Sequence, residues 1–167
     1  MTDSKTIVEK LELQPHPEGG YFKEIYRSNE IIKNSGLPER FAGDRNFGTS
    51  IYYLLEKEQF STFHKLKSDE TWHFYYGSSL LLHAIDENGN YTKIILGNDL
   101  TNGEIFQYTV LRNCWFAAEV ADKNSFSLIG ATVAPGFDFS DFEMGKRDEL
   151  ISKFPEQKEL ITRLTQI

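Results

Sequence analysis

Short β-prone segments separated by turn residues fill the middle of the chain, residues 47–133. Each segment is rich in β-branched, aromatic or other apolar residues, and turn formers such as glycine, asparagine and aspartate separate it from the next. We predict eight strands, at residues 47–55, 60–66, 71–76, 79–85, 91–96, 105–111, 114–120 and 125–133. Because helices do not alternate with these strands, the pattern favours an all-β sandwich or barrel over a parallel α/β sheet.

A further strand is predicted before this region, at residues 21–28. Successive side chains of a strand point to opposite faces. Regular alternation would therefore place Phe22, Glu24 and Tyr26 on one face of this strand and Arg27 on the other.

Helices are expected at both ends of the chain. Apolar residues at helical spacing predict a short helix at residues 6–13, and apolar stripes predict two more at residues 147–154 and 155–164. We expect the C-terminal pair to pack on the outside of the barrel. The predicted organisation is one domain over residues 1–167, with the barrel at about 20–143 and the C-terminal helices at about 146–165.

The composition argues against several classes of partner. With 18 Lys and Arg against 25 Asp and Glu, the formal net charge is −7, which gives nucleic acid no electrostatic attraction. The N-terminal sequence has no apolar run long enough for a signal peptide or a membrane span, so we expect no membrane partner. The single cysteine, Cys114, excludes an internal disulfide. This usage fits a reducing compartment and predicts a cytoplasmic protein.

Residues 60–77 hold the side chains with the clearest chemical potential, because two of the four histidines and an acidic pair fall here. Two β-prone segments flank the polar residues 67–69, a pattern that predicts a hairpin. Such a hairpin would hold His64 and Glu70 close enough to share one cavity. A neutral imidazole beside a carboxylate is what metal binding or proton transfer requires.

Three other features bear on this site. His73 follows Glu70 by three residues and faces the opposite side of a regular strand, unless a bulge brings it round. Residues 138–143 hold acids that either reach into the cavity or, as we favour, belong to a segment whose phenylalanine rings cap the barrel. His16, which lies between two prolines, is expected to be a surface or packing residue.

Five short motifs resemble those of one protein family. They are PHPEGGYF at 15–22, TSIY at 49–52, SDETWHF at 68–74, WFA at 115–117 and VAPGFDFSDFE at 133–143. His64, Glu70 and Gly77 also stand at the spacing of the first cupin motif. The chain thus resembles the cupin superfamily, in a small branch of unknown function that is similar in fold to the dTDP-sugar epimerases.

This resemblance implies the cupin double-stranded β-helix, or jelly-roll barrel, and a homodimer with strands near the N-terminus packing across the interface. Metal-dependent cupins usually hold their ion with three histidines and a glutamate. Here Leu66 and Phe116 occupy two of the histidine positions. That leaves His64 and Glu70, with His73 as a substitute ligand. We therefore expect no cofactor, and a divalent metal on these last three residues is the alternative.

Three functions remain open. The first, which we favour, is a metal-independent isomerase or epimerase acting on a carbohydrate or nucleotide-sugar. The dTDP-sugar epimerases use a histidine base, an acidic partner and a tyrosine acid. By analogy of fold, His64 is the base, oriented by Glu70 or by an acid of residues 138–143, and Tyr52 or Tyr75 is the acid. The second function is non-catalytic binding of a small-molecule ligand, and the third is metal-dependent catalysis with the three ligands above.

Other side chains are expected to line the cavity and contact the ligand. Flat rings with a few polar groups hold sugars and nucleotide bases, and in a small barrel the core and the cavity lining are one surface. The predicted ligand-binding residues are Ser50, Phe63, Trp72, His73, Gln107, Trp115, Phe116, Phe137 and Asp141.

Overall fold

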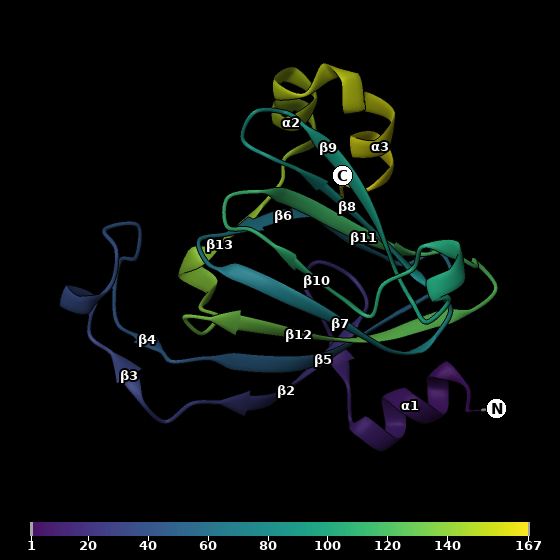
Figure 1. Cartoon of the computed structure of the whole chain (residues 1–167), viewed down its shortest axis with the longest axis horizontal. Coiled ribbons are helices and arrows are strands. Elements are labelled where there is room, and N and C mark those ends of the chain that lie inside the picture. Colours follow the sequence, from purple (N-terminus) through teal and green to yellow (C-terminus); the bar gives the residue numbers. More distant parts are fainter. Residues whose placement is uncertain (1, 167) are drawn as a thin grey trace.

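Two β-sheets face each other in the computed structural model, which describes residues 2–166 (Figure 1). The strands are β1 (Gln14–Pro15), β2 (Tyr21–Arg27), β3 (Ile31–Ile32), β4 (Arg45–Asn46), β5 (Thr49–Glu56), β6 (Phe60–Leu66), β7 (Asp69–Gly77), β8 (Leu80–Ile85), β9 (Tyr91–Leu96), β10 (Gln107–Val110), β11 (Trp115–Val120), β12 (Phe126–Ala134) and β13 (Phe142–Met144). The helices are α1 (Ser4–Leu11), α2 (Arg147–Lys153) and α3 (Lys158–Arg163). This arrangement confirms the predicted fold class, a mostly β jelly roll with short helices at both ends.

The strand order defines two antiparallel sheets. One has the order β1-β2-β5-β12-β7-β10, and the other has the order β13-β6-β11-β8-β9. Figure 1 shows α2 and α3 beyond the second sheet and α1 beside the first, so the helices lie outside the barrel. The turn residues at 86–90, between two of the predicted strands, join β8 to β9, which pair from Leu80 opposite Leu96 to Ile85 opposite Tyr91.

The predicted hairpin at residues 60–77 is wrong. β6 pairs with β11 and β13, whereas β7 pairs with β12 and β10, so the two consecutive strands belong to different sheets. The short link between them crosses from one sheet to the other. A turn signal tells where a strand ends but does not choose the partner of the next strand. In this fold the strands that pair with β6 and β7 are distant from them in sequence.

Strand β2 departs from the alternation that its sequence predicts. Its pairing with β5 shifts between Glu24 and Tyr26, which makes Ile25 the extra residue of a β-bulge. The bulge reverses the faces that follow it. Arg27 therefore shares the cavity side with Glu24, while Tyr26 is 57% exposed.

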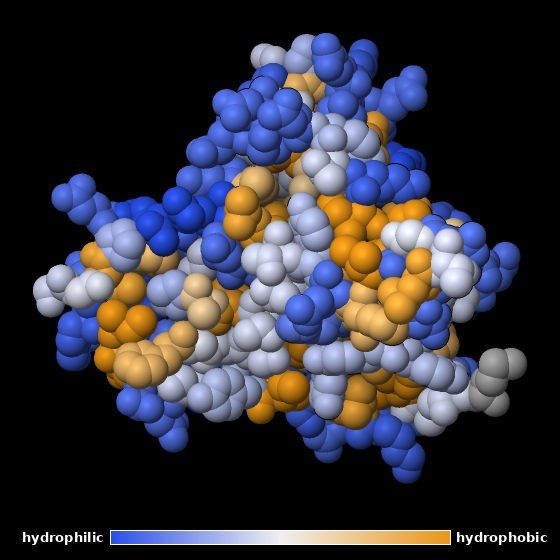
Figure 2. All heavy atoms as spheres, viewed as in Figure 1, coloured by the Kyte–Doolittle hydropathy of each residue, from blue (hydrophilic) through white to orange (hydrophobic). Residues whose placement is uncertain are grey.

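The connection between β2 and β5 forms an arm beside the barrel. β3 and β4 pair within it, with Ile31 opposite Asn46. Figure 2 shows hydrophobic residues at the surface in this region, at the left of the view. Ile31 and Phe47 are about half exposed here, at 51% and 49%. The arm thus offers apolar side chains to solvent in the isolated chain.

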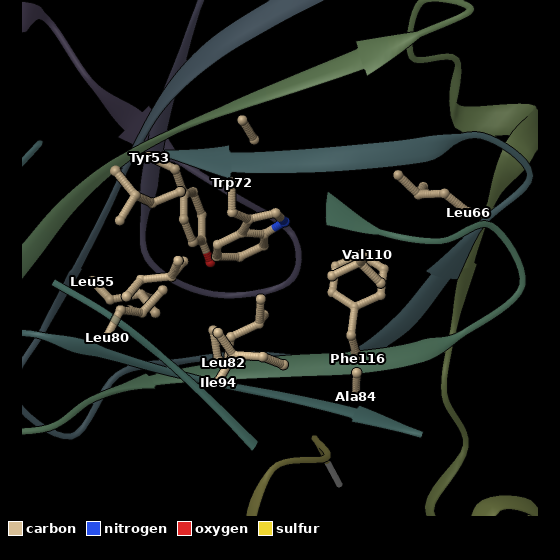
Figure 3. Close-up of a cluster of buried hydrophobic side chains, with 14 of the residues drawn as sticks. Tyr53, Leu55, Leu66, Trp72, Leu80, Leu82, Ala84, Ile94, Val110 and Phe116 are labelled. Carbon is tan, nitrogen blue, oxygen red and sulfur yellow. The ribbon is translucent and has the colours of Figure 1, made fainter. Parts of the chain in front are cut away.

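The main core fills the space between the sheets. Figure 3 shows Tyr53 next to Trp72, with Leu80 and Leu82 from the opposite sheet below them. The two rings meet edge to face with centroids 5.9 Å apart. A second cluster joins Phe63 of β6 to α2 and α3 and confirms that the C-terminal helices pack on the outside of the barrel. None of the helices in residues 2–166 has the length and apolar character that crossing a bilayer requires.

Candidate functional site

A cavity of about 230 Å³ lies between the sheets. Its walls come from the loop before β2, from five strands and from the segment that follows β12. The lining residues are His16, Glu18, Phe22, Glu24, Arg27, Thr49, Ile51, His64, Leu66, Glu70, Ala131, Val133, Phe137, Asp138, Phe139 and Phe142. The lining therefore combines four carboxyl groups, two imidazoles and one guanidinium with aromatic rings.

The proton positions on His64 follow from its two contacts. Its Nδ1 lies 2.8 Å from the Thr62 carbonyl oxygen. A carbonyl can only accept a hydrogen bond, so Nδ1 carries a proton and the Nε2 of a neutral ring is an acceptor. That Nε2 lies 3.2 Å from Oε2 of Glu18. One proton is therefore shared between Nε2 and Oε2, on the carboxyl group in a neutral pair or on the imidazole in an ion pair.

Burial decides between these two forms. His64 and Glu18 are both almost fully buried, with 2% and 6% of their surface exposed. Removal from water lowers the pKa of His64 and raises the pKa of Glu18. Both shifts favour the neutral pair, in which the Glu18 carboxyl group donates to Nε2 of His64.

A pair of glycines brings Glu18 into the barrel. Gly19 and Gly20 have φ angles of +112° and +71°, which side chains rarely adopt. A Cβ atom at Gly19 would also collide with the carbonyl oxygen of Phe60. The turn is held in place because the Thr62 N–H donates to the Glu18 carbonyl at 2.9 Å and the Tyr53 hydroxyl donates to the Gly19 carbonyl at 2.6 Å.

His16 completes a row of three ionisable groups. Its Nδ1 accepts a hydrogen bond from the backbone N–H of Glu18 at 3.3 Å and lies 3.7 Å from Oε1 of the same residue. Glu18 thus lies between His16 and His64. Burial lowers the pKa of His16. We expected His16 to be a surface or packing residue; it packs against Phe22 and also lines the cavity.

Glu70 is a second buried acid in the cavity. Its Oε2 accepts a hydrogen bond from the indole N–H of Trp72 at 2.8 Å. Burial raises the pKa of Glu70 to about 7, so the group is poised to gain or lose a proton near neutral pH. The structure brings His64 and Glu70 to one cavity, but the carboxyl group in contact with His64 is that of Glu18.

The Glu70→Gln variant should lose part of the pH dependence of stability. Because the pKa of Glu70 in the folded protein, about 7, lies above its ordinary value of 4.5, the favourable contribution is complete below about pH 4.5. It is lost as the pH rises through 7, at a cost on the order of 3 kcal/mol. Glutamine keeps an acceptor for Trp72 and has no proton to lose. Urea unfolding between about pH 5 and about pH 8 measures the effect.

A matched control for this experiment is Glu9→Gln on the exposed side of α1. That variant should keep the wild-type dependence of the unfolding free energy on pH. If Glu70→Gln also kept it, Glu70 would not be a protonated acid in the folded protein.

The mouth of the cavity carries a charged group and a cluster of rings. Arg27 donates to both oxygens of Glu24, at 2.9 and 2.7 Å, and to the Phe137 carbonyl at 3.1 Å. The rings of Phe137, Phe139 and Phe142 pack against one another with centroids 5.0 to 6.3 Å apart. These rings cover the mouth and also line the cavity, so the capping role that we predicted for this segment does not exclude contact with a ligand.

The two tyrosines predicted as the acid lie elsewhere. Tyr52 and Tyr75 contact each other edge to face, with centroids 6.0 Å apart, on the outer side of the first sheet. On β5 the inward side chain is that of Tyr53, because residues alternate along the strand. Tyr75 is 47% exposed. Neither predicted tyrosine lines the cavity with His64.

His73 also faces outward. Its Nε2 lies 3.2 Å from the hydroxyl oxygen of Thr132, and its ring stacks with that of Tyr75. The bulge in β7 occurs beyond His73, where the pairing with β12 shifts between Leu128 and Ile129. His73 therefore stays on the face opposite Glu70, and the predicted metal set of His64, Glu70 and His73 is not gathered.

Only Phe137 of the other predicted ligand-binding residues lines the cavity. The Trp72 indole N–H donates a hydrogen bond to Glu70. The Phe116 ring packs on the His64 ring, with the ring centroids 4.1 Å apart. The remaining five side chains point away from the cavity. Ser50 and Gln107 face outward, because their neighbours along the strand face inward. Phe63 and Trp115 pack towards the C-terminal helices. Asp141 forms an ion pair with Arg45.

The donor set does not fit the metal site of metal-dependent cupins. Leu66 lines the cavity with hydrocarbon, and the Phe116 ring covers one face of His64. The Nδ1 of His64 is held by the Thr62 carbonyl. Within residues 2–166, no three His, Cys, Asp or Glu side chains form a group that could hold a metal ion.

Comparison with known proteins agrees with the fold. Residues 5–145 match the Cupin superfamily (DUF985), and the chain belongs to this family. It is 32% identical over 154 residues to the uncharacterized protein YML079W of Saccharomyces cerevisiae. This match covers 86% of this chain and 76% of the yeast protein. Membership in this superfamily supports a small-molecule-binding cupin.

Solved structures show the same architecture. Protein SO0799 from Shewanella oneidensis superposes with a TM-score of 0.90 at 35% identity, covering 99% of both chains. A hypothetical protein from Leishmania major superposes with a TM-score of 0.89 at 31% identity, covering 99% of this chain and 100% of that one. Oxalate decarboxylase from Bacillus subtilis is similar in fold alone, with a TM-score of 0.54 at 16% identity over 90% of this chain and 36% of that one.

Proposed function

We propose that the cavity binds a small carbohydrate and catalyses a metal-independent isomerisation or epimerisation. The observation that supports this best is the buried pair of His64 and Glu18, in which the Thr62 carbonyl fixes the protonated nitrogen of the ring. A ring held in this way presents one nitrogen, Nε2, for proton transfer. Reactions of this class need such a group, because they move a proton at a carbon atom beside a carbonyl.

Two proton-active groups suffice for the reaction. In the neutral pair the Glu18 carboxyl proton occupies Nε2 of His64, so Glu18 first loses this proton to solvent. The neutral His64 then takes the proton from the substrate C–H at Nε2, and the Glu18 carboxylate 3.2 Å away stabilises the imidazolium that forms. Glu70 gives its proton to the carbonyl oxygen, which yields an enediol. His64 then returns its proton to carbon, at the neighbouring atom in an isomerisation or on the opposite face of the same atom in an epimerisation. Glu70 takes back the proton that it gave to the oxygen.

A non-catalytic binding module is the second candidate. The outward position of Tyr52 and Tyr75 favours this candidate. The dTDP-sugar epimerases use a tyrosine as the acid, and neither of the two tyrosines predicted for that role lines the cavity. The binding module would use the same cavity without turnover.

One experiment separates the two candidates. A library of small carbohydrates is screened by the shift in melting temperature, and the compounds that bind are then incubated with the protein in deuterated water. The isomerase incorporates deuterium at carbon in a bound compound. A compound that binds and gains no deuterium at carbon identifies the binding module instead.

We propose that this chemistry uses no resident metal ion. The support is the donor set, since Leu66 and Phe116 place hydrocarbon at two of the four ligand positions of metal-dependent cupins. Elemental analysis of protein purified without chelator is expected to find only traces of transition metal. Metal present at close to one equivalent per chain, lost together with deuterium incorporation on dialysis against a chelator, would overturn this view.

We also propose that the protein is a homodimer through the arm and β2. Ile25, Tyr26, Ile31 and Phe47 expose 46–57% of their surface in the isolated chain. Burial of such side chains against a second copy removes apolar area from water. The Ile31→Glu variant should therefore be monomeric by light scattering, while the Leu100→Glu variant, at an exposed leucine in the loop after β9, should stay dimeric. A wild-type protein that is monomeric would contradict the proposal.

A further inference from the structure

We infer, on the basis of the proposed function, that the substrate is a polyhydroxylated molecule without an anionic group, such as a free sugar. Phosphorylated sugars, sugar acids and nucleotide-sugars are excluded by the charges that line the cavity.

The cavity lining holds more acids than bases. Glu18, Glu24, Glu70 and Asp138 face a single guanidinium, that of Arg27. Within residues 2–166, Arg27 is the only lysine or arginine of the lining. Burial also keeps the two imidazoles neutral. Of the four acids, Glu18 is protonated in its pair with His64, Glu70 has a pKa of about 7, and Glu24 is paired with Arg27. A phosphate or carboxylate that entered would therefore meet the Asp138 carboxylate, and the juxtaposition of like charges is costly in a partly desolvated site.

The guanidinium of Arg27 is already engaged. Its Nε and one terminal nitrogen donate to the two oxygens of Glu24, so the pair is bidentate. The other terminal nitrogen donates to the amide oxygen of Asn46 at 2.9 Å and to the Phe137 carbonyl at 3.1 Å. A guanidinium has five N–H donors, and these contacts use four of them. Arg27 therefore orders the mouth of the cavity and has little capacity left for an anion.

The remaining groups suit hydroxyl groups and C–H faces. Carboxylates accept hydrogen bonds from hydroxyls, and Asp138 and Glu24 present such oxygens at the mouth. The Phe137, Phe139 and Phe142 rings give an apolar surface beside them. A sugar ring offers hydroxyls at its edge and C–H groups on its face, which matches this combination.

The test compares matched ligands on the purified protein. Hexoses are measured by calorimetry beside the corresponding phosphate monoesters, uronic acids and nucleoside-diphosphate sugars. A free hexose should bind at least about tenfold more tightly than its anionic derivatives. Anionic derivatives that bind as tightly as the free sugars, or a complete lack of binding by the free sugars, would overturn the inference.

A single substitution should weaken the selectivity. Glu24→Gln leaves Arg27 with an uncompensated charge at the mouth, so binding of the phosphate monoester should improve by roughly threefold to tenfold. The control is Glu12→Gln, which removes an exposed ion pair with Lys23 outside the cavity and should leave the selectivity unchanged. An unchanged affinity for the phosphate in Glu24→Gln would count against the role given to the Glu24–Arg27 pair.

Binding tests the proposed substrate class, and turnover tests the proposed isomerase activity. Binding of free sugars without deuterium incorporation would support the substrate class and reject the isomerase. Deuterium incorporation into a phosphorylated or nucleotide-linked sugar would support the isomerase and reject the substrate class.

Discussion

In the His64→Gln variant, deuterium incorporation into the bound carbohydrate should be about 10²- to 10⁴-fold slower than in the wild type. This is the usual loss of rate when a general base is removed. Glutamine has nearly the same size and can still bond to the Thr62 carbonyl, but it cannot take a proton at neutral pH. The melting temperature of the variant should therefore stay close to that of the wild type. The rate is measured by NMR in deuterated water on the ligand found by screening.

The matched control for this variant is His73→Gln. His73 carries the same side chain on the outer face of β7, bonded to Thr132. It should retain the full rate of deuterium incorporation. Equal losses in the two variants, or no loss in His64→Gln, would show that His64 is not the base.

The Arg45→Met variant should lose about 3–5 kcal/mol of unfolding free energy, the usual cost of breaking a buried ion pair by removing one partner. Arg45 and Asp141 are each 5% exposed, and two of the Arg45 nitrogens lie 2.6 Å from the two carboxylate oxygens. Without the guanidinium, Asp141 is left as a buried charge with the Lys67 ammonium 3.8 Å away. Chemical denaturation of wild type and variant gives the difference directly.

Two further variants show whether the ion pair is the cause. Arg45→Met combined with Asp141→Leu removes both charges and should recover much of the lost stability. Arg40→Met removes an exposed arginine of the same arm and should change the unfolding free energy by less than about 1 kcal/mol. A double variant as unstable as the single one would assign the loss to packing rather than to the buried charge.

The Arg45–Asp141 pair also bears on the cavity. Asp141 belongs to the segment that carries Phe137 and Phe142 over the mouth, and Arg45 belongs to the arm. The pair thus fastens the cover of the cavity to the arm. Arg45→Met should consequently weaken ligand binding as well as the fold.

The long strands could be predicted from the sequence, but most of their partners could not. Alternation and turn residues located the strand segments, including β6 and β7. Whether two consecutive strands pair or cross between sheets depends on closure of the barrel, which is a property of the whole chain. For the same reason His64 and Glu70 reach one cavity across the barrel and not across a hairpin.

The candidate site was predictable in part. The cupin motif pointed to His64 and Glu70, which do line the cavity. Glu18 was missed because two glycines follow it, and such a corner is typical of an exposed turn. The signal that could have found it is the same pair of glycines, since adjacent glycines let a loop approach a strand closely. Arg27 was assigned to the wrong face because a bulge leaves no clear mark in a sequence.

The outward residues show a second limit. Tyr52 and Tyr53 are adjacent in the chain and chemically alike, so only the register of β5 decides which of them enters the barrel. The structure places Tyr53 inside, where it bonds to the Gly19 carbonyl. His73 and Tyr75 depend in the same way on the faces of β7. Residue type alone could not separate cavity from surface at these positions.

Nitrogen NMR of the histidine rings tests the proposed His64–Glu18 pair, because it reports which nitrogen of His64 holds a proton and when the ring becomes charged. We expect that at pH 7 the Nδ1 of His64 is protonated towards Thr62 and Nε2 is an acceptor facing Glu18, with a pKa of the ring below the ordinary value of about 6.5. A ring protonated on Nε2 alone, or one that titrates at the ordinary pKa of an exposed histidine, would contradict this expectation.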